Sequence, residues 1–406
     1  MGVSIKGGLI GNGNGNGAKQ LICRKRRNDE EMGNYLPPAK CSRRRNGNED
    51  EPAAGGEFVP KVSKVCHFWA QGKYCRYGDK GCRFLHKWVA SGDLSLMKQL
   101  KEDSPVTGIA HLPSVDGFSH KLVSATKDGC LKIWDYGCGA GDCSSFSTRL
   151  GVQVTSMESL DPWVFLGIPN AVMVWNAKTN AHLTLPAAPV GLVYALAARD
   201  DWLMAGQQDG SISTWRFPSN EDDNVFQPSG VLKGHSLPVI SLSLGDKFLY
   251  SGSMDNTVRV WELETQLCVF TLTGHTAAVT SLICWEHYLL SASLDATVKV
   301  WGRDSSGLNL ELVYTHTLTH GVIAFDGYHD SSGKPMLMCS CNDNSLCLYN
   351  LPSFKERGKI FCKEEIRAVG ACSEPGCIFT GDGAGELRLW KCPMLEAPPK
   401  ISSSKK

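Results

Sequence analysis

Seven short strand-like segments, rich in apolar residues and each ending in an aromatic side chain, recur along most of the chain. They span residues 131–134, 171–175, 211–215, 257–261, 297–301, 345–349 and 386–390, and the last residue is Trp in all but the sixth, where it is Tyr. The aromatic residues follow one another at intervals of 41, 40, 46, 40, 48 and 41 residues. A period of about 40–45 residues is typical of a four-stranded blade, so the pattern predicts an all-β propeller with seven blades.

A turn signal precedes most of these segments. An Asp stands six residues before the aromatic residue in five of the seven repeats, and Gly, Asn or Ala follows it; these residues are Asp128, Asp209, Asp255, Asp295 and Asp343. Such pairs favour a tight turn between two strands. The second repeat has Pro169 at this position and the last has Ala384, with Asp382 nearby.

Two repeats also carry a Gly-His pair. His235 lies 20 residues before Asp255, and His275 lies 20 residues before Asp295. We expect each His and Asp to form a buried hydrogen-bond network with the terminal Trp of the blade and with serines of 251–253 or 291–293. An unpaired buried polar group costs about 1–3 kcal/mol, so such groups need partners. The predicted network residues are His235, Asp255, Trp261, His275, Asp295 and Trp301.

The segment before the first repeat suggests how the ring closes. Residues 100–106 are similar to residues 232–239, which lead into a well-marked repeat, although they are one residue shorter and have no Gly-His. The strand in this segment belongs to no earlier blade. We therefore expect it to be the fourth strand of the last blade, where it removes an open sheet edge.

Ahead of the repeats lies a set of metal-ligand residues. Cys66, Cys75, Cys82 and His86 have the spacing C-x8-C-x6-C-x3-H. Three thiolates and one imidazole form a closed tetrahedral set that suits Zn²⁺ and leaves no position for a catalytic water. The pattern predicts one structural zinc ion, which such a short segment needs in order to fold.

The residues between these ligands resemble the CCCH zinc finger, in Cys75–Asp79 and again in Cys82–His86. In that family, aromatic residues at the positions of Tyr77 and Phe84 stack on unpaired bases. The resemblance and the local charge give a set of predicted RNA contacts: Tyr77, Phe84, Phe68, Lys73, Arg76, Lys80, Arg83 and Lys87. Phe84 and Phe68 have core packing around the zinc as their alternative role, and for Trp69 we favour core packing.

A single finger ahead of seven repeats resembles the plant CCCH zinc finger and WD-repeat proteins over residues 61–393. Trp134-Asp135 is the one literal Trp-Asp pair at the end of a repeat. The resemblance implies a regulatory protein associated with nucleic acid. The predicted organisation is a disordered basic tail at 1–56, a CCCH zinc finger at 57–90, a seven-bladed WD-repeat propeller at 91–395 and a flexible tail at 396–406.

Charge separates the chain into two parts. The whole chain has a formal net charge of +1, but residues 1–90 carry 17 Lys/Arg and 8 Asp/Glu, a net of +9, which leaves −8 for the rest. This asymmetry suggests that the first part contacts a polyanion. Two basic clusters in the tail predict nuclear import: Arg24, Lys25, Arg26 and Arg27, then Arg43, Arg44 and Arg45. The 17 cysteines, an odd number, and the lack of a long apolar run indicate a reducing compartment and no membrane span.

These features favour a nucleic-acid-binding adaptor that is not an enzyme. In the leading hypothesis the finger binds single-stranded RNA while the propeller scaffolds an unidentified protein partner in post-transcriptional regulation. One alternative is a nuclear DNA- or chromatin-associated regulator that uses the same finger. The other is a protein-interaction scaffold whose zinc knob is structural. We expect the protein in the nucleus, with the cytoplasm as a second compartment.

Overall fold

The computed structural model describes residues 64–89, 94–112, 121–135, 144–187, 191–217, 226–285, 287–304, 309–330, 333–372 and 377–391. The predicted tails and the nuclear-import clusters lie outside these residues. The chain divides into two units, residues 1–57 and residues 58–406, and the second unit contains everything described below. The predicted domain limits stay predictions.

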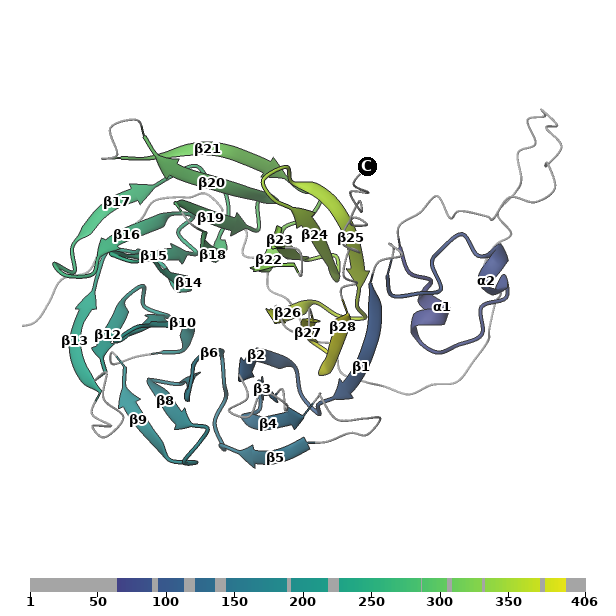
Figure 1. Cartoon of the computed structure of the whole chain (residues 1–406), viewed down its shortest axis with the longest axis horizontal. Coiled ribbons are helices and arrows are strands. Elements are labelled where there is room, and N and C mark those ends of the chain that lie inside the picture. Colours follow the sequence, from purple (N-terminus) through teal and green to yellow (C-terminus); the bar gives the residue numbers. More distant parts are fainter. Residues whose placement is uncertain are drawn as a thin grey trace, which may run out of the picture. The chain divides into compact units, whose positions relative to one another are not determined.

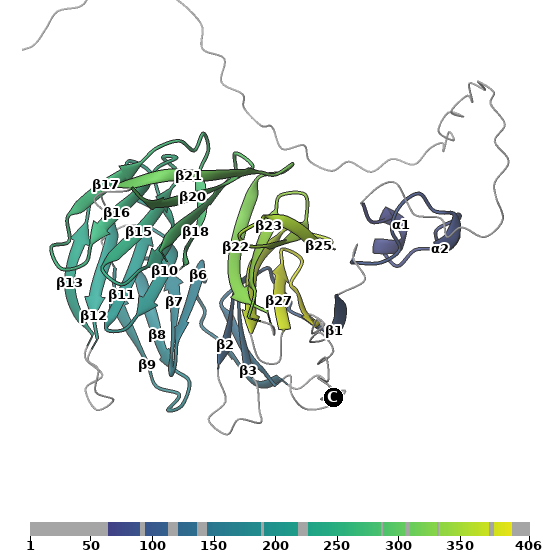
Figure 2. The same ribbon diagram turned by 45° about the horizontal axis from the view of Figure 1, so that its top comes forward.

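The described strands form seven antiparallel four-stranded sheets around a central axis, so the predicted seven-bladed propeller is confirmed (Figure 1, Figure 2). The inner strands are β2 (Val106–Leu112), β6 (Ser156–Leu160), β10 (Val193–Arg199), β14 (Val239–Leu244), β18 (Val279–Trp285), β22 (Val322–His329) and β26 (Ile366–Cys372). The second strands are β3 (Lys121–Thr126), β7 (Trp163–Ile168), β11 (Trp202–Gln207), β15 (Phe248–Ser253), β19 (Tyr288–Ser293), β23 (Pro335–Cys341) and β27 (Cys377–Asp382).

The third strands contain the repeated segments that the sequence predicts: β4 (Cys130–Asp135), β8 (Ala171–Asn176), β12 (Ile212–Arg216), β16 (Val258–Glu262), β20 (Thr297–Arg303), β24 (Ser345–Asn350) and β28 (Glu386–Lys391). The outer strands are β5 (Ser144–Arg149), β9 (His182–Pro186), β13 (Gln227–Leu232), β17 (Cys268–Leu272), β21 (Leu310–Thr317), β25 (Lys355–Phe361) and β1 (Ser95–Lys101). Two short helices, α1 (His67–Ala70) and α2 (Gly78–Gly81), precede them.

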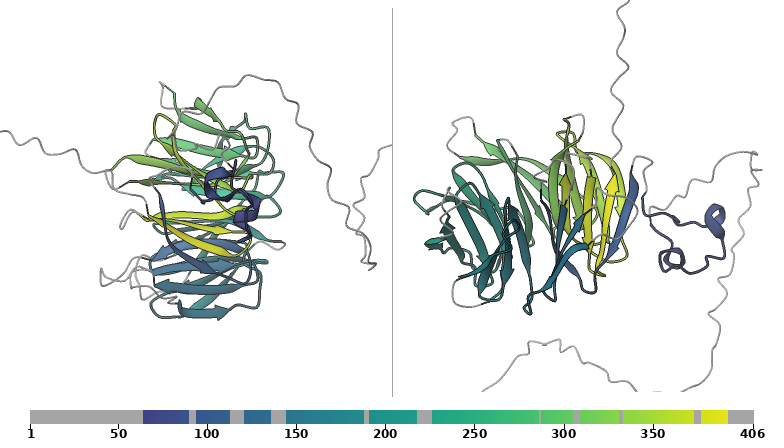
Figure 3. Two further views of the ribbon diagram at one scale, coloured as in Figure 1. Left: turned by 90° about the vertical axis from the view of Figure 1, so that its right-hand side faces the viewer. Right: turned by 60° about the horizontal axis from the view of Figure 1, so that its bottom comes forward.

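The first of the described strands, β1, closes the ring, as predicted. β1 pairs antiparallel with β28, with Leu100 opposite Leu387, and the sheet order is β1-β28-β27-β26. The blue β1 lies beside the yellow strands of the last blade (Figure 3). Leu100 then joins a core cluster in which Leu122 and Trp134 of blade 1 pack with Phe379 of blade 7. The closing strand therefore also seals the seam between the first and the last blade.

The two Gly-His repeats contain the same hydrogen-bond chain. His235 Nδ1 lies 2.8 Å from Asp255 Oδ2, and His235 Nε2 lies 2.8 Å from Ser251 Oγ. Trp261 Nε1 donates to the same Oγ at 2.8 Å. The corresponding atoms of His275, Asp295, Ser291 and Trp301 have the same distances, 2.8 Å in each case. In each of these blades the hydrogen bonds join the loop before the inner strand to the second and third strands.

Blade 1 builds a related network without a histidine. Ser124 Oγ accepts a hydrogen bond from Trp134 Nε1 at 2.8 Å and donates to Glu102 Oε1 at 2.7 Å. Lys132 pairs with the other oxygen of Glu102 at 2.6 Å, and Glu102 is 1% exposed. The carboxylate therefore takes the structural place of the missing imidazole.

The closure predicts that removing residues 91–103 opens the ring. The deletion leaves one edge of β28 unpaired and takes Leu100 and Glu102 out of buried positions, so we expect the midpoint of thermal unfolding to fall by at least about 5 °C. Calorimetry of the truncated and full-length chains measures this. A deletion of residues 1–56, which leaves β1 intact, is the control, and equal midpoints for all three chains would contradict the closure.

The histidine networks predict a loss of stability in mild acid. Burial lowers the pKa of His235 and of His275, whereas histidines of an unfolded chain titrate near about pH 6.5. The unfolded chain then binds protons more readily, so the free energy of unfolding falls as the pH drops below about 6.5. We expect His275→Gln to give a shallower fall between pH 7 and pH 5 in urea titrations. The exposed His182→Gln is the control, and an unchanged slope in His275→Gln argues against this origin.

Candidate metal centre and nucleic-acid surface

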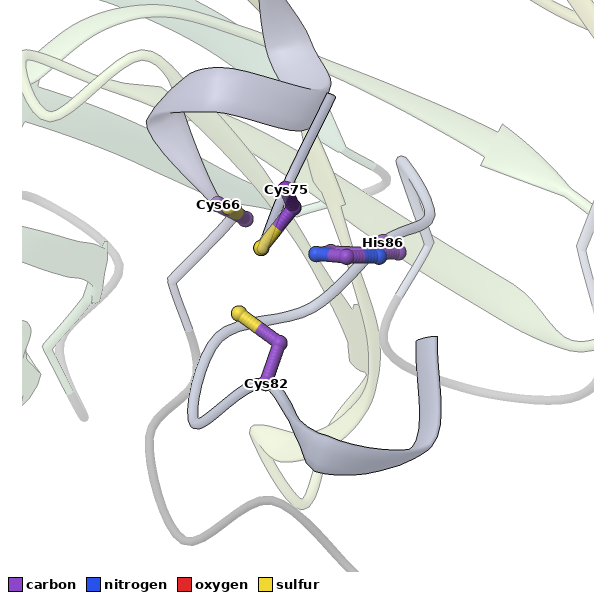
Figure 4. Close-up of side chains that lie close together, drawn as sticks. All are labelled: Cys66, Cys75, Cys82 and His86. Carbon is purple, nitrogen blue, oxygen red and sulfur yellow. The ribbon is translucent and has the colours of Figure 1, made fainter. Parts of the chain in front are cut away.

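The four predicted metal ligands converge on one point (Figure 4). The three Sγ atoms and a ring nitrogen of His86 all lie within 4.8 Å of one another. Cys66 immediately precedes α1 and Cys82 immediately follows α2, so the two short helices bring their ends to the same centre. The three cysteines are at most 7% exposed.

Backbone hydrogen bonds hold the ligand loops together. The Cys66 N–H donates to the Leu85 carbonyl at 2.8 Å, and the Leu85 N–H donates to the Lys64 carbonyl at 2.9 Å. Gly72 and Gly78 have φ values of +69° and +60°, which residues with a Cβ seldom adopt. The turns that separate the ligands therefore depend on glycine at these two positions.

The donor set fits a structural zinc ion. Tetrahedral zinc with thiolate and imidazole ligands places the ligand atoms roughly 4 Å apart, close to the observed spacing. Burial opposes ionisation of Cys66, but hydrogen bonds from the Trp69 backbone and from the His86 side chain outweigh it and lower the pKa of the Cys66 thiol to about 7. A thiolate forms readily under these conditions, and the thiolate is the form that binds metal.

The aromatic residues around the centre divide into two groups. Trp69 stacks on the His86 ring with centroids 6.1 Å apart and packs against the buried cysteines, so it lies in the core of the finger. Tyr77, Phe68 and Phe84 are exposed, at 61%, 56% and 41% of their surface.

Sequence reasoning missed one exposed aromatic residue, Tyr74, whose side chain is 87% exposed. Its place directly before Cys75 gave no signal, because Val65 and Leu85, which directly precede Cys66 and His86, are partly buried.

Basic side chains surround these rings. Lys73, Arg76, Arg83 and Lys87 are all exposed, and the Arg76 guanidinium lies 5.2 Å from the centroid of the Tyr77 ring. The side chain of Lys80, the fifth predicted phosphate contact, lies outside the described part of the structure. Exposed rings and cations thus share the surface of one small zinc-centred module.

The segment that follows His86 packs against the last two blades. The Phe361 N–H donates to the Trp88 carbonyl at 2.8 Å, and Val89 forms a bridge with Ile360. The guanidinium of Arg388 lies 4.8 Å from the centroid of the Trp88 ring. The predicted finger segment therefore ends in residues that belong to a propeller core.

Comparisons with known proteins agree with both parts of the chain. The WD domain, G-beta repeat family matches residues 94–135, 226–262 and 266–302. Zinc finger CCCH domain-containing protein 17 of Oryza sativa subsp. japonica is 46% identical over 346 residues, which cover 85% of this chain and 76% of that protein. Zinc finger CCCH domain-containing protein 48 of Arabidopsis thaliana is 49% identical over 349 residues, which cover 86% and 78%.

A solved structure shows the same fold at lower sequence similarity. The computationally designed Ika8 protein matches with a TM-score of 0.54 and 21% identity, covering 72% of this chain and 97% of its own. Within the described residues, no helix has the length and apolar character needed to cross a membrane.

Loss of a zinc ligand predicts local unfolding. In Cys82→Ser we expect the bound zinc to fall from about one equivalent to a small fraction, because a neutral hydroxyl replaces a thiolate. Atomic absorption gives the zinc content, and amide hydrogen exchange in residues 64–89 reports on local unfolding of the finger. Cys268→Ser, at an exposed thiol of β17, is the matched control. Full zinc content in Cys82→Ser would exclude the assigned ligand set.

Proposed function

The chain belongs to the CCCH zinc finger proteins of plants, and from this membership and the geometry of the finger we propose that it is a nucleic-acid-binding adaptor. The finger binds single-stranded RNA, and the propeller holds a protein partner. Post-transcriptional regulation in the nucleus is the setting that fits both activities. This proposal assigns no catalytic role to the chain.

The exposure of the finger's aromatic rings carries the proposal. Tyr74, Tyr77, Phe68 and Phe84 stand on a module of fewer than 30 residues, where each exposed ring forgoes the burial that would stabilise the fold. Aromatic side chains on a basic surface form stacking platforms for bases, and each stacked base is worth about 1–3 kcal/mol. Exposed Lys and Arg side chains supply the charge that attracts phosphates.

The chemistry of stacking favours an unpaired strand. A ring stacks on the flat face of a base, and in a duplex those faces are covered by neighbouring base pairs. Sequence-specific recognition of RNA is directed mostly at single-stranded loops and ends for this reason. One finger contacts few nucleotides, so a second contact through the propeller's partner or the basic tail would raise the effective affinity.

Substitution of the exposed rings tests the proposal. We expect Tyr77→Ala and Phe84→Ala each to weaken binding of the full-length zinc-loaded chain to random single-stranded RNA by about 5- to 150-fold, the equivalent of one lost stacking contact. Tyr288→Ala removes an exposed ring from blade 5 and is the matched control. Fluorescence anisotropy at two salt concentrations gives the affinities, and zinc content shows that the finger is intact.

The same titrations separate the alternatives. Single-stranded and duplex DNA of equal length serve as competitors. Equal affinity for duplex DNA would favour the chromatin-associated regulator. Absence of binding to every nucleic acid would leave the protein-interaction scaffold and refute the adaptor.

A further inference from the structure

The outer strand of blade 5, β21, lacks the protection that the other six outer strands have. An outer strand has unpaired N–H and C=O groups that can pair with another extended chain. Proteins prevent such pairing by placing Lys, Arg or Pro on the edge strand, or by keeping that strand short. β1, β5 and β25 carry Lys or Arg, β9 and β13 carry Pro, and β17 has five residues. β21 has eight residues and no Pro, Lys or Arg, and Glu311 is its one carboxylate.

Three consecutive apolar side chains are exposed on this strand. Leu312, Val313 and Tyr314 are 45%, 59% and 46% exposed. A bulge in the pairing with β20 sets Trp301 opposite Leu312 and Val300 opposite Tyr314, so Val313 is the extra residue. The bulge recurs in blades 1, 3, 4, 6 and 7, where the extra residues are Ser145, Ser229, Val269, Arg357 and Met97.

A glycine extends this apolar surface onto the neighbouring strands. The residue after the terminal aromatic is polar or charged in the other six repeats, at Asp135, Asn176, Arg216, Glu262, Asn350 and Lys391. Blade 5 has Gly302 there, and a Cβ at this position would come within 2.9 Å of Val313 Cγ2 and 3.0 Å of Tyr288 Cε1. Glycine thus leaves room for the side chains of Val313 and Tyr288 to lie over β20. Tyr288 is itself 48% exposed, so an apolar surface spans β19, β20 and β21.

We propose that β21 is the site where an extended segment of a protein partner adds a fifth strand to blade 5 (Figure 1, Figure 2). This inference rests on the proposed adaptor function and names the kind of partner that the propeller takes. The main-chain groups along a sheet edge are satisfied by another extended chain, and pockets for alternate side chains give the specificity. The partner segment has apolar residues at alternate positions and a basic residue that faces Glu311.

The size of the edge favours a peptide over a second copy of the chain. A stable interface between two folded proteins buries at least about 1,000 Å², more than an eight-residue strand edge supplies. A flexible segment needs only the edge itself, because main-chain hydrogen bonds provide much of its affinity.

Selection from a library of random 12-residue peptides displayed on phage, with the full-length zinc-loaded chain as bait, tests the site. We expect the enriched peptides to alternate apolar and polar residues and to slow amide hydrogen exchange in residues 310–317. Val313→Lys is expected to weaken their binding at least 10-fold, because lysine guards the edge. Val269→Lys, the same change at the equivalent bulge position of blade 4, should leave it unchanged. Leu312→Lys is a second variant, and thermal unfolding checks the fold of all three.

Two results would overturn the inference. One is that no enriched peptide loses affinity in Val313→Lys or Leu312→Lys. The other is that sedimentation shows a dimer of the wild-type chain which Val313→Lys and Leu312→Lys dissociate. RNA binding by the same variants separates this inference from the proposed function. If RNA binds normally and no such peptide is selected, the strand-addition site is refuted and the RNA-binding role stands. If such peptides are selected but RNA does not bind, the RNA-binding role is refuted and the strand-addition site stands.

Discussion

The antiparallel pairing of β1 with β28 closes the ring, and the packing between the seven blades relies on that closure. Each blade buries its faces against its neighbours, so a ring that is open at one seam exposes the apolar faces of two blades and one strand edge. The chain closes the ring with β1, a strand that precedes the first repeat and pairs in the last blade. The chain that leaves the zinc centre therefore has to reach the last blade within a few residues. Trp88 already faces Arg388 of that blade, and Val89 forms a bridge with Ile360 of the neighbouring sixth blade.

A series of packed rings then links the zinc centre to the last blade. The ring of the ligand His86 stacks on Trp69, and the ring centroids of Trp69 and Trp88 are 5.1 Å apart. The Trp88 ring in turn faces the guanidinium of Arg388. Arg388 is fully buried, and it pairs with Glu386, which reduces the cost of removing its charge from water. The finger is thus held by interactions with the propeller as well as by its metal. In the proposed adaptor role, these interactions would hold the RNA bound by the finger and the protein partner bound by the propeller in a fixed relation.

The regular features of this structure were accessible from sequence because each leaves a signal at fixed spacing. The period of the terminal aromatic residues predicts seven blades, the four ligands predict the metal, and the segment at 100–106 predicts the closure. Other features depend on three-dimensional surroundings that spacing does not encode. Glu102 takes the structural place of a histidine because Ser124 and Lys132 meet it in space, and Val89 joins a propeller core through a bridge to a strand about 270 residues later. The exposure of Tyr74 and of β21 likewise depends on what the fold leaves uncovered.

The proposed function requires the zinc-centred finger to contact the bases of single-stranded RNA. Photocrosslinking of the full-length chain to an RNA containing 4-thiouridine, followed by mass spectrometry of the peptides, identifies the residues that contact the bases. We expect crosslinks within residues 64–89, centred on Tyr74, Tyr77 and Phe84, and their loss when zinc is removed. Crosslinks confined to the propeller strands and loops, or a crosslinking pattern that does not change on removal of zinc, would contradict it.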